Sequence, residues 1–198
     1  MTLEILIALI SFAVATSITP GPNNLMLMAS GANYGLRRTV PHMLGISLGH
    51  AFMVTMVGVV LLRVFATYPM LNILLIVLSV TYMLWLAWKI ANAVPPDAKS
   101  VTGKPLTFLQ AAAFQWVNPK AWFMAISAIS GYAPQNQGVW VGSLMVAAVF
   151  AATNLPSITI WAWIGVQVRR WLGSAKRLRA FNISMALLLV ASLYPMFM

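Results

Sequence analysis

The chain contains no cysteine, and among its 198 residues only Glu4 and Asp97 are acidic. Without cysteine it can form neither disulfides nor thiolate metal sites, and it has no thiol redox chemistry. Two carboxylates are also too few to ligate a divalent cation, so we expect neither a metal nor a cofactor. The 12 Lys and Arg residues and the 2 acids together leave too little charge to cover the surface of a water-soluble domain of this length.

Hydrophobic residues make up 61% of the chain, and its mean hydropathy is +0.87. They form six apolar segments, and four of these contain no Lys, Arg, Asp or Glu. A backbone inside lipid must satisfy its own polar groups, and about 20 residues of helix cross the hydrocarbon core. The sequence therefore predicts an all-α membrane protein in contact with lipid, with six transmembrane helices over the segments Leu3–Ile18, Val40–Leu62, Pro69–Trp88, Leu106–Tyr132, Val139–Val166 and Ala180–Met198.

The basic residues lie between the apolar segments. The net charge of +10 could indicate nucleic-acid binding, but short clusters between spans are typical of loops at an anionic membrane surface, so no nucleic-acid partner is expected. With six spans, the loops after the first, third and fifth segments share one side and hold 10 of the 12 Lys and Arg residues, whereas the other side holds only Arg63. The positive-inside rule places these three loops in the cytoplasm and both termini outside.

A cut near residue 100 leaves three predicted spans in each half. Because three is an odd number, the two halves must cross the membrane in opposite directions, which is the inverted repeat typical of secondary transporters. We therefore divide the chain into a first repeat over residues 1–91, a linker over 92–105 and a second repeat over 106–198.

Each half carries a proline motif that should break its first helix. The motifs are Thr19, Pro20, Gly21, Pro22, Asn23 and Asn24 in the first half, and Asn118, Pro119 and Lys120 in the second. Two prolines flanking a glycine cannot continue a regular helix, because each proline removes a donor and clashes with the preceding turn. Inside a bilayer such a break is tolerated only where protein or a water-filled cavity satisfies the freed backbone groups. Helices restarting at Asn23 or Asn24 and near Lys120 would present two positive ends, which suit a substrate carboxylate.

Alternative interpretations of these motifs remain open. The first motif could instead end the first span at the cytoplasmic surface, with residues 25–35 as an interfacial helix. Lys120, near the middle of the fourth segment, could contact a substrate anion, or it could snorkel toward the interface or form a structural pair. Asn154, beside Pro156, could line the path or mark a kink.

Two histidines lie in the second segment. His50, near its centre, titrates close to neutral pH and is a candidate for proton coupling, with a hydrogen-bonded structural role as the alternative. His42 lies near the cytoplasmic end and is expected at the interface. Ser47 and His50 could also be read as the nucleophile and base of an intramembrane enzyme, although no acid is present to orient the histidine. A structural membrane subunit is a third class.

Four motifs of the sequence point to a known family: the Thr19-Pro20-Gly21-Pro22-Asn23 string, Gly45 and Gly49 in the second segment, Trp85-Leu86-x-Trp88, and Asn118-Pro119-Lys120. With these motifs the chain resembles the LysE/RhtB family of amino-acid exporters. The resemblance covers nearly the whole chain. It implies a secondary transporter, not an enzyme, that exports a small amino-acid-like substrate across the bacterial inner membrane with the proton as coupling ion. The first motif is most similar to that of the cysteine and O-acetylserine exporter branch. The resemblance is also compatible with a homo-oligomer.

Overall fold

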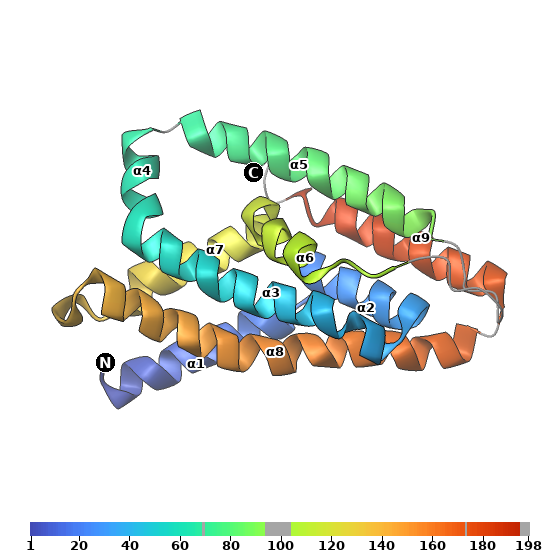
Figure 1. Ribbon diagram of the computed structural model, residues 1–198, viewed down its shortest axis with the longest axis horizontal. Coiled ribbons are helices and arrows are strands. Elements are labelled where there is room, and N and C mark those ends of the chain that lie inside the picture. Colours follow the sequence, from blue (N-terminus) through green and yellow to red (C-terminus); the bar gives the residue numbers. More distant parts are fainter. Residues whose placement is uncertain (69, 94–103, 173, 195–198) are drawn as a thin grey trace.

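The computed structural model describes residues 1–68, 70–93, 104–172 and 174–194, and every regular element within these ranges is helical (Figure 1). The expectation of an all-α protein is therefore confirmed for this part of the chain. Most of the predicted linker, together with Lys99, lies outside the described residues.

In the first half, the helix predicted to break does so between Ile18 and Pro22, where the two pieces meet at an angle of 52°. Val57 to Leu61 form one π-helical turn in the helix that follows. The elements in chain order are α1 (Leu3–Ile18), α2 (Pro22–Tyr34), α3 (Leu36–Met56), the π-helix η1 (Val57–Leu61), α4 (Leu62–Thr67) and α5 (Met70–Ala91).

The second half repeats the broken first helix. A short helix passes into a 3-10 turn, and a new helix begins after Asn118. The elements are α6 (Phe108–Phe114), the 3-10 helix η2 (Gln115–Val117), α7 (Pro119–Tyr132), the 3-10 helix η3 (Gln135–Gln137), α8 (Val139–Leu172) and α9 (Ala175–Ala191).

The last two helices extend beyond the predicted apolar segments. Arg169 and Arg170 form part of the last turn of α8 instead of a loop, and α9 begins at Ala175, before the predicted Ala180. Two physical reasons account for this. Lys and Arg are good helix formers that favour helix C-termini, and the Ser174 hydroxyl accepts a hydrogen bond from the N–H of Arg177, which caps α9.

Three helices of the described chain are long and apolar enough to cross a membrane: Leu36–Val64, Ile73–Ala91 and Val139–Leu172. The bent pair α1 and α2 is a fourth candidate. In Figure 1 the α2–α3 junction, the end of α5 and the α8–α9 junction lie at one end of the molecule, and α4 lies at the other. The basic residues of these junctions therefore gather at a single end, which we call the basic end.

Glycines allow the helices to approach closely. A Cβ at Gly31 or Gly165 would lie 2.1 Å from the Ala162 carbonyl oxygen or 2.0 Å from that of Met28, so α2 and α8 touch backbone to backbone. Gly45 and Gly49 allow α3 to approach α6 as closely. A Cβ at Gly45 would lie 2.3 Å from the Phe108 oxygen, and one at Gly49 would lie 2.6 Å from Ala112 Cα. Small residues at this spacing are how helices pack in membranes, where lipid removes the hydrophobic driving force.

Candidate functional site

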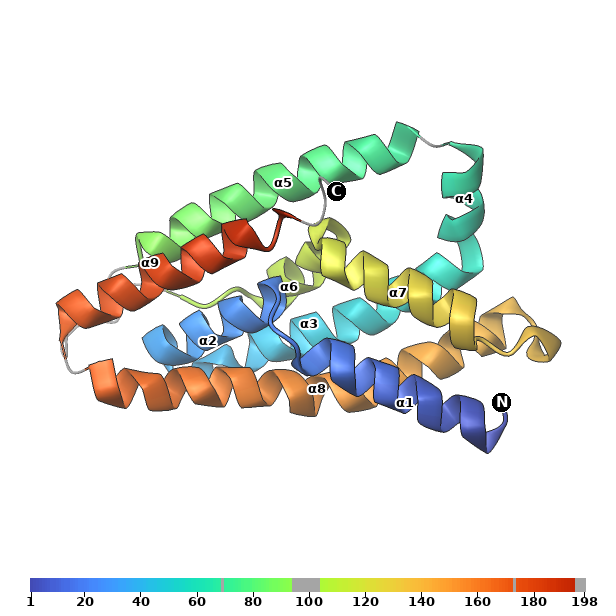
Figure 2. The same cartoon turned by 180° about the vertical axis from the view of Figure 1, so that it is seen from behind.

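The first helix break lies near the middle of the long axis of the molecule (Figure 2). The second piece begins at Pro22, slightly before the predicted Asn23 or Asn24, because proline is favoured in the first turn of a helix, where its missing N–H has no partner to lose. Most of α2 is buried, and it packs against α3 and α8. A helix lying in the membrane interface would expose one face, so the interpretation of residues 25–35 as an interfacial helix is wrong.

Side chains satisfy the carbonyl groups that the first break leaves free. The Asn24 amide donates to the Ser17 oxygen at 2.8 Å and to the Thr19 oxygen at 2.7 Å. The Trp161 indole N–H donates to the Ile18 oxygen at 3.0 Å. Unpaired carbonyls inside a bilayer cost several kcal/mol each, so these contacts allow the chain to leave helical geometry there.

Lys120 reaches the same break from the second half. Its Nζ donates to the Thr19 carbonyl oxygen at 2.7 Å, to Thr19 Oγ1 at 2.8 Å and to the Pro20 oxygen at 3.2 Å. A Cβ on Gly21 would lie 2.7 Å from Lys120 Cδ, so a larger residue here would require the Lys120 side chain to shift. The lysine thus forms the structural pairing considered for it, and its ammonium is held at the break.

The second break is capped by its own asparagine. Pro119 is the first residue of α7, and Asn118 Oδ1 accepts a hydrogen bond from the N–H of Lys120 at 3.1 Å. This arrangement is a standard N-cap, which ends the preceding turn and sets the direction of the new helix.

A pair of amides joins the two breaks. Asn23 donates to Gln115 Oε1 at 2.9 Å, and Gln115 donates to Asn23 Oδ1 at 3.2 Å. Gln115 is fully buried and also donates to the Ala111 oxygen at 2.9 Å. We did not predict this residue as part of the site. The available signal was an amide inside an apolar segment, one helical turn before Asn118.

Most of the predicted site residues line one pocket, which we call the central pocket. Four of the predicted site residues do not line this pocket: Thr19, Pro20, Pro22 and Pro119. They influence its shape through the backbone breaks and through the contacts of Lys120. Its lining also includes residues that the sequence did not single out, among them Thr16, Ser17, Gln115 and Met124. The predicted residues that it brings together are Gly21, Asn23, Asn24, His50, Asn118, Lys120 and Asn154.

The central pocket is electropositive. Among the described residues, Lys120 is the one charged residue that lines it. The backbone N–H groups of Asn23 and Asn24 have no acceptor within the described parts of the chain. Two helix N-termini therefore end at the pocket, each with roughly half a positive charge. This combination suits a small anion such as a carboxylate, whose lost hydration the fixed dipoles and the ammonium would replace.

His50 reaches the same pocket from α3. It is 1% exposed, and neither ring nitrogen has a partner within the described residues. Its ring meets that of Phe150 edge to face, with the centroids 4.9 Å apart. The Ser47 hydroxyl donates to the Ala151 oxygen at 3.3 Å, so it is not paired with His50 as a nucleophile would be with its base. His42 is also buried among the helices, and its position at the level of the cytoplasmic interface stays a prediction.

The chain is also similar in sequence to known proteins. The model of the LysE type translocator family matches residues 14–192. The chain belongs to this family. In this LysE type translocator, the Thr19–Asn24 string that resembles the family lies at the first helix break. The resemblance inferred from that string is therefore confirmed.

Curated relatives match the chain over almost its full length. The cysteine/O-acetylserine efflux proteins of Escherichia coli (strain K12) and Shigella sonnei (strain Ss046) are each 31% identical over 192 residues, which is 96% of this chain and 96% of theirs. The protein of that name from Escherichia coli O139:H28 is 30% identical over the same span. No solved structure matches the chain.

Proposed function

We propose that the chain is a secondary transporter that exports cysteine, O-acetylserine or similar small amino acids from the cytoplasm across the bacterial inner membrane. The observation that carries the proposal is the central pocket, where two helix N-termini and the Lys120 ammonium meet, with no acid among the described lining residues. In it the substrate carboxylate lies between the restarts at Pro22 and Pro119. Membership of a translocator family and the names of the relatives support the same class of activity.

The proposal includes six spans arranged as two inverted repeats. The repeats are residues 1–91 and 106–198, on either side of the 92–105 linker. The spans correspond to α1 with α2, α3 with α4, α5, α6 with α7, α8, and α9. Support comes from the matching breaks: α2 and α7 each begin with a proline and end at a tyrosine, Tyr34 and Tyr132. The gathering of Lys and Arg at one end supports a cytoplasmic basic end and extracytoplasmic termini.

The remaining groups of the pocket define the substrate class. An α-ammonium group would meet amide and hydroxyl oxygens, because no carboxylate of the described residues lines the pocket. A second ammonium, as in lysine, would lack a counter-ion at this site, and its desolvation would oppose binding. Small amino acids with neutral side chains therefore fit the pocket best.

Proton coupling through His50 completes the proposal. Its imidazole lines the central pocket and has no partner in the described chain, so gain or loss of a proton there would change the charge directly beside the substrate.

A flux assay tests the proposed function. The purified protein is reconstituted into liposomes of neutral lipid, and the counterflow of radiolabelled O-acetylserine is compared with that of radiolabelled lysine. We expect saturable counterflow of O-acetylserine and none of lysine. Absence of counterflow for every small neutral amino acid would contradict the proposal.

A further inference from the structure

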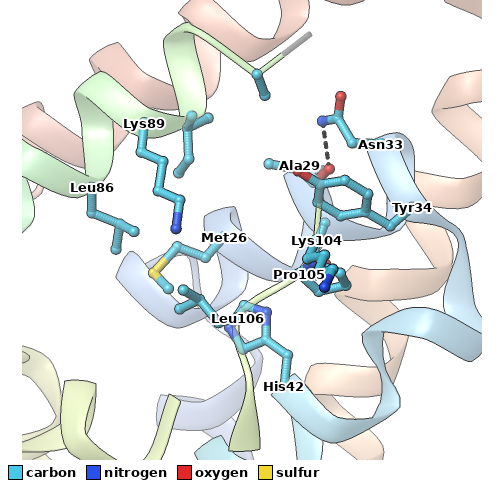
Figure 3. A pocket seen from close by; sticks show the side chains of 13 residues that line it. Met26, Ala29, Asn33, Tyr34, His42, Leu86, Lys89, Lys104, Pro105 and Leu106 are labelled. Carbon is cyan, nitrogen blue, oxygen red and sulfur yellow. Dashed lines mark hydrogen bonds between the residues drawn. The ribbon is translucent and has the colours of Figure 1, made fainter. Parts of the chain in front are cut away.

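A second pocket lies at the basic end between α2, α3 and α5, and we call it the basic pocket. Met26, Leu86 and Leu106 supply apolar surface to its lining. Figure 3 shows Lys89 extending from α5 toward Met26, and Lys104 beside Pro105 and Tyr34. The pocket therefore joins an apolar surface to two cations that come from different halves of the chain.

Both lysines lack an ion pair within the described residues. Lys89 Nζ lies 5.1 Å from the centre of the Trp85 ring, and neither lysine contacts a carboxylate there. Glu4, the one acid among the described residues, belongs to the first turn of α1. The N-terminal end of α1 lies far from the basic end in both views (Figures 1 and 2). An anion entering the basic pocket would therefore meet no competing acid from α1.

His42 provides independent evidence that a ligand binds in this pocket. Its side chain lines the pocket and is 2% exposed, and both ring nitrogens lack a hydrogen-bond partner within the described chain. A buried imidazole with no partner costs free energy, and most such groups in folded proteins have one. A polar ligand in the basic pocket would supply the missing partner.

One helix connects the basic pocket to the central pocket. Asn23 lines the central pocket, and Met26, Ser30 and Asn33 of α2 line the basic pocket. Successive positions are three or four residues apart, so all four lie on one face of α2. Met26, with 3% exposure, stands between the pockets, and its flexible unbranched side chain could turn aside.

We infer that the basic pocket is a capture site, which binds the carboxylate of the amino acid on its way from the cytoplasm to the central pocket. This inference rests on the proposed function. Lys89 and Lys104 attract the carboxylate, His42 hydrogen-bonds to the bound molecule, and Met26 closes the way to Asn23 until the substrate moves along α2.

Thiol labelling tests the capture site, because the natural chain has no cysteine. Ser30→Cys places a single thiol in the basic pocket, and Ser174→Cys places one at the exposed cap of α9 as a matched control. Each variant is reconstituted in neutral lipid and treated with an anionic, water-soluble methanethiosulfonate. We expect O-acetylserine to slow the labelling of Ser30→Cys, its amide to have little effect, and the labelling of Ser174→Cys to respond to neither.

A second measurement does not depend on the new thiol. Replacing both Lys89 and Lys104 by Gln should raise the half-saturating O-acetylserine concentration on the cytoplasmic side roughly fivefold, because two partly solvated charges are lost. The maximal rate should change little, and Lys176→Gln should change neither quantity.

The outcomes separate the two claims. If the wild type shows no counterflow, both the proposed function and the capture site are overturned. If it shows normal counterflow but O-acetylserine does not protect Ser30→Cys, or the Lys89 and Lys104 replacement leaves half-saturation unchanged, only the capture site is overturned. Protection that depends on added anionic lipid and not on the amino acid would reassign the pocket to lipid headgroups and would also overturn it.

Discussion

At the scale of single residues, His50 is the group on which proton coupling depends. His50→Gln keeps a polar side chain of similar size but cannot change its charge. We expect counterflow of the amino acid to persist while accumulation driven by a pH gradient is lost. Uptake into liposomes with and without an imposed gradient measures this, and unchanged gradient dependence in the variant would place the proton path elsewhere.

The Asn23–Gln115 pair is the residue-scale contact that holds the two breaks together. Gln115→Leu leaves the Asn23 amide without its partner, and we expect unfolding in detergent to become easier by about 1–3 kcal/mol. Leu at both positions should recover part of that loss, because no polar group is then stranded. Thr81→Val, which removes one exposed local hydrogen bond, serves as the control. A Gln115→Leu variant as stable as this control would contradict the account.

At the scale of helices, the contact of α2 with α8 sets the position of the broken helix. Gly165→Ala would place a methyl group 2.0 Å from the Met28 carbonyl oxygen, which belongs to the backbone and cannot turn away. We expect a destabilisation of about 1–3 kcal/mol or more. Gly131→Ala in α7 meets nothing within 4 Å and should be neutral or stabilising by up to about 1 kcal/mol. Thermal unfolding of the two variants side by side checks this, and equal melting temperatures would refute the contact.

The helices also show what the sequence could and could not predict. Both breaks were predictable, because prolines at residues 20, 22 and 119 act on the backbone locally. The Asn23–Gln115 pair joins residues 92 positions apart, and the burial of His42 depends on helices that pack around it, so neither has a local signature. The ends of α8 and α9 were misplaced because hydropathy marks the lipid boundary, whereas helix propensity and the Ser174 cap decide where the helices end.

At the scale of the whole molecule, the orientation follows from the single basic end. Two exposed capping residues suit a test with single cysteines, Thr2 before α1 and Ser174 before α9. In intact cells stripped of their outer membrane, Thr2→Cys should react with an impermeant thiol reagent, whereas Ser174→Cys should react only after permeabilisation. The reverse pattern would invert the proposed topology and turn the capture site toward the outside.

The central claim is that the substrate carboxylate binds between the two helix restarts beside Lys120. The most direct measurement compares O-acetylserine with its amide in counterflow by the wild type and by Lys120→Met. A charge-assisted hydrogen bond contributes about 1.5–3 kcal/mol, so the variant should bind the acid at least roughly tenfold more weakly. Its loss toward the amide should be much smaller, because the amide carries no negative charge. Equal losses for both compounds would show that Lys120 only holds the break through Thr19 and Pro20, and would contradict the account.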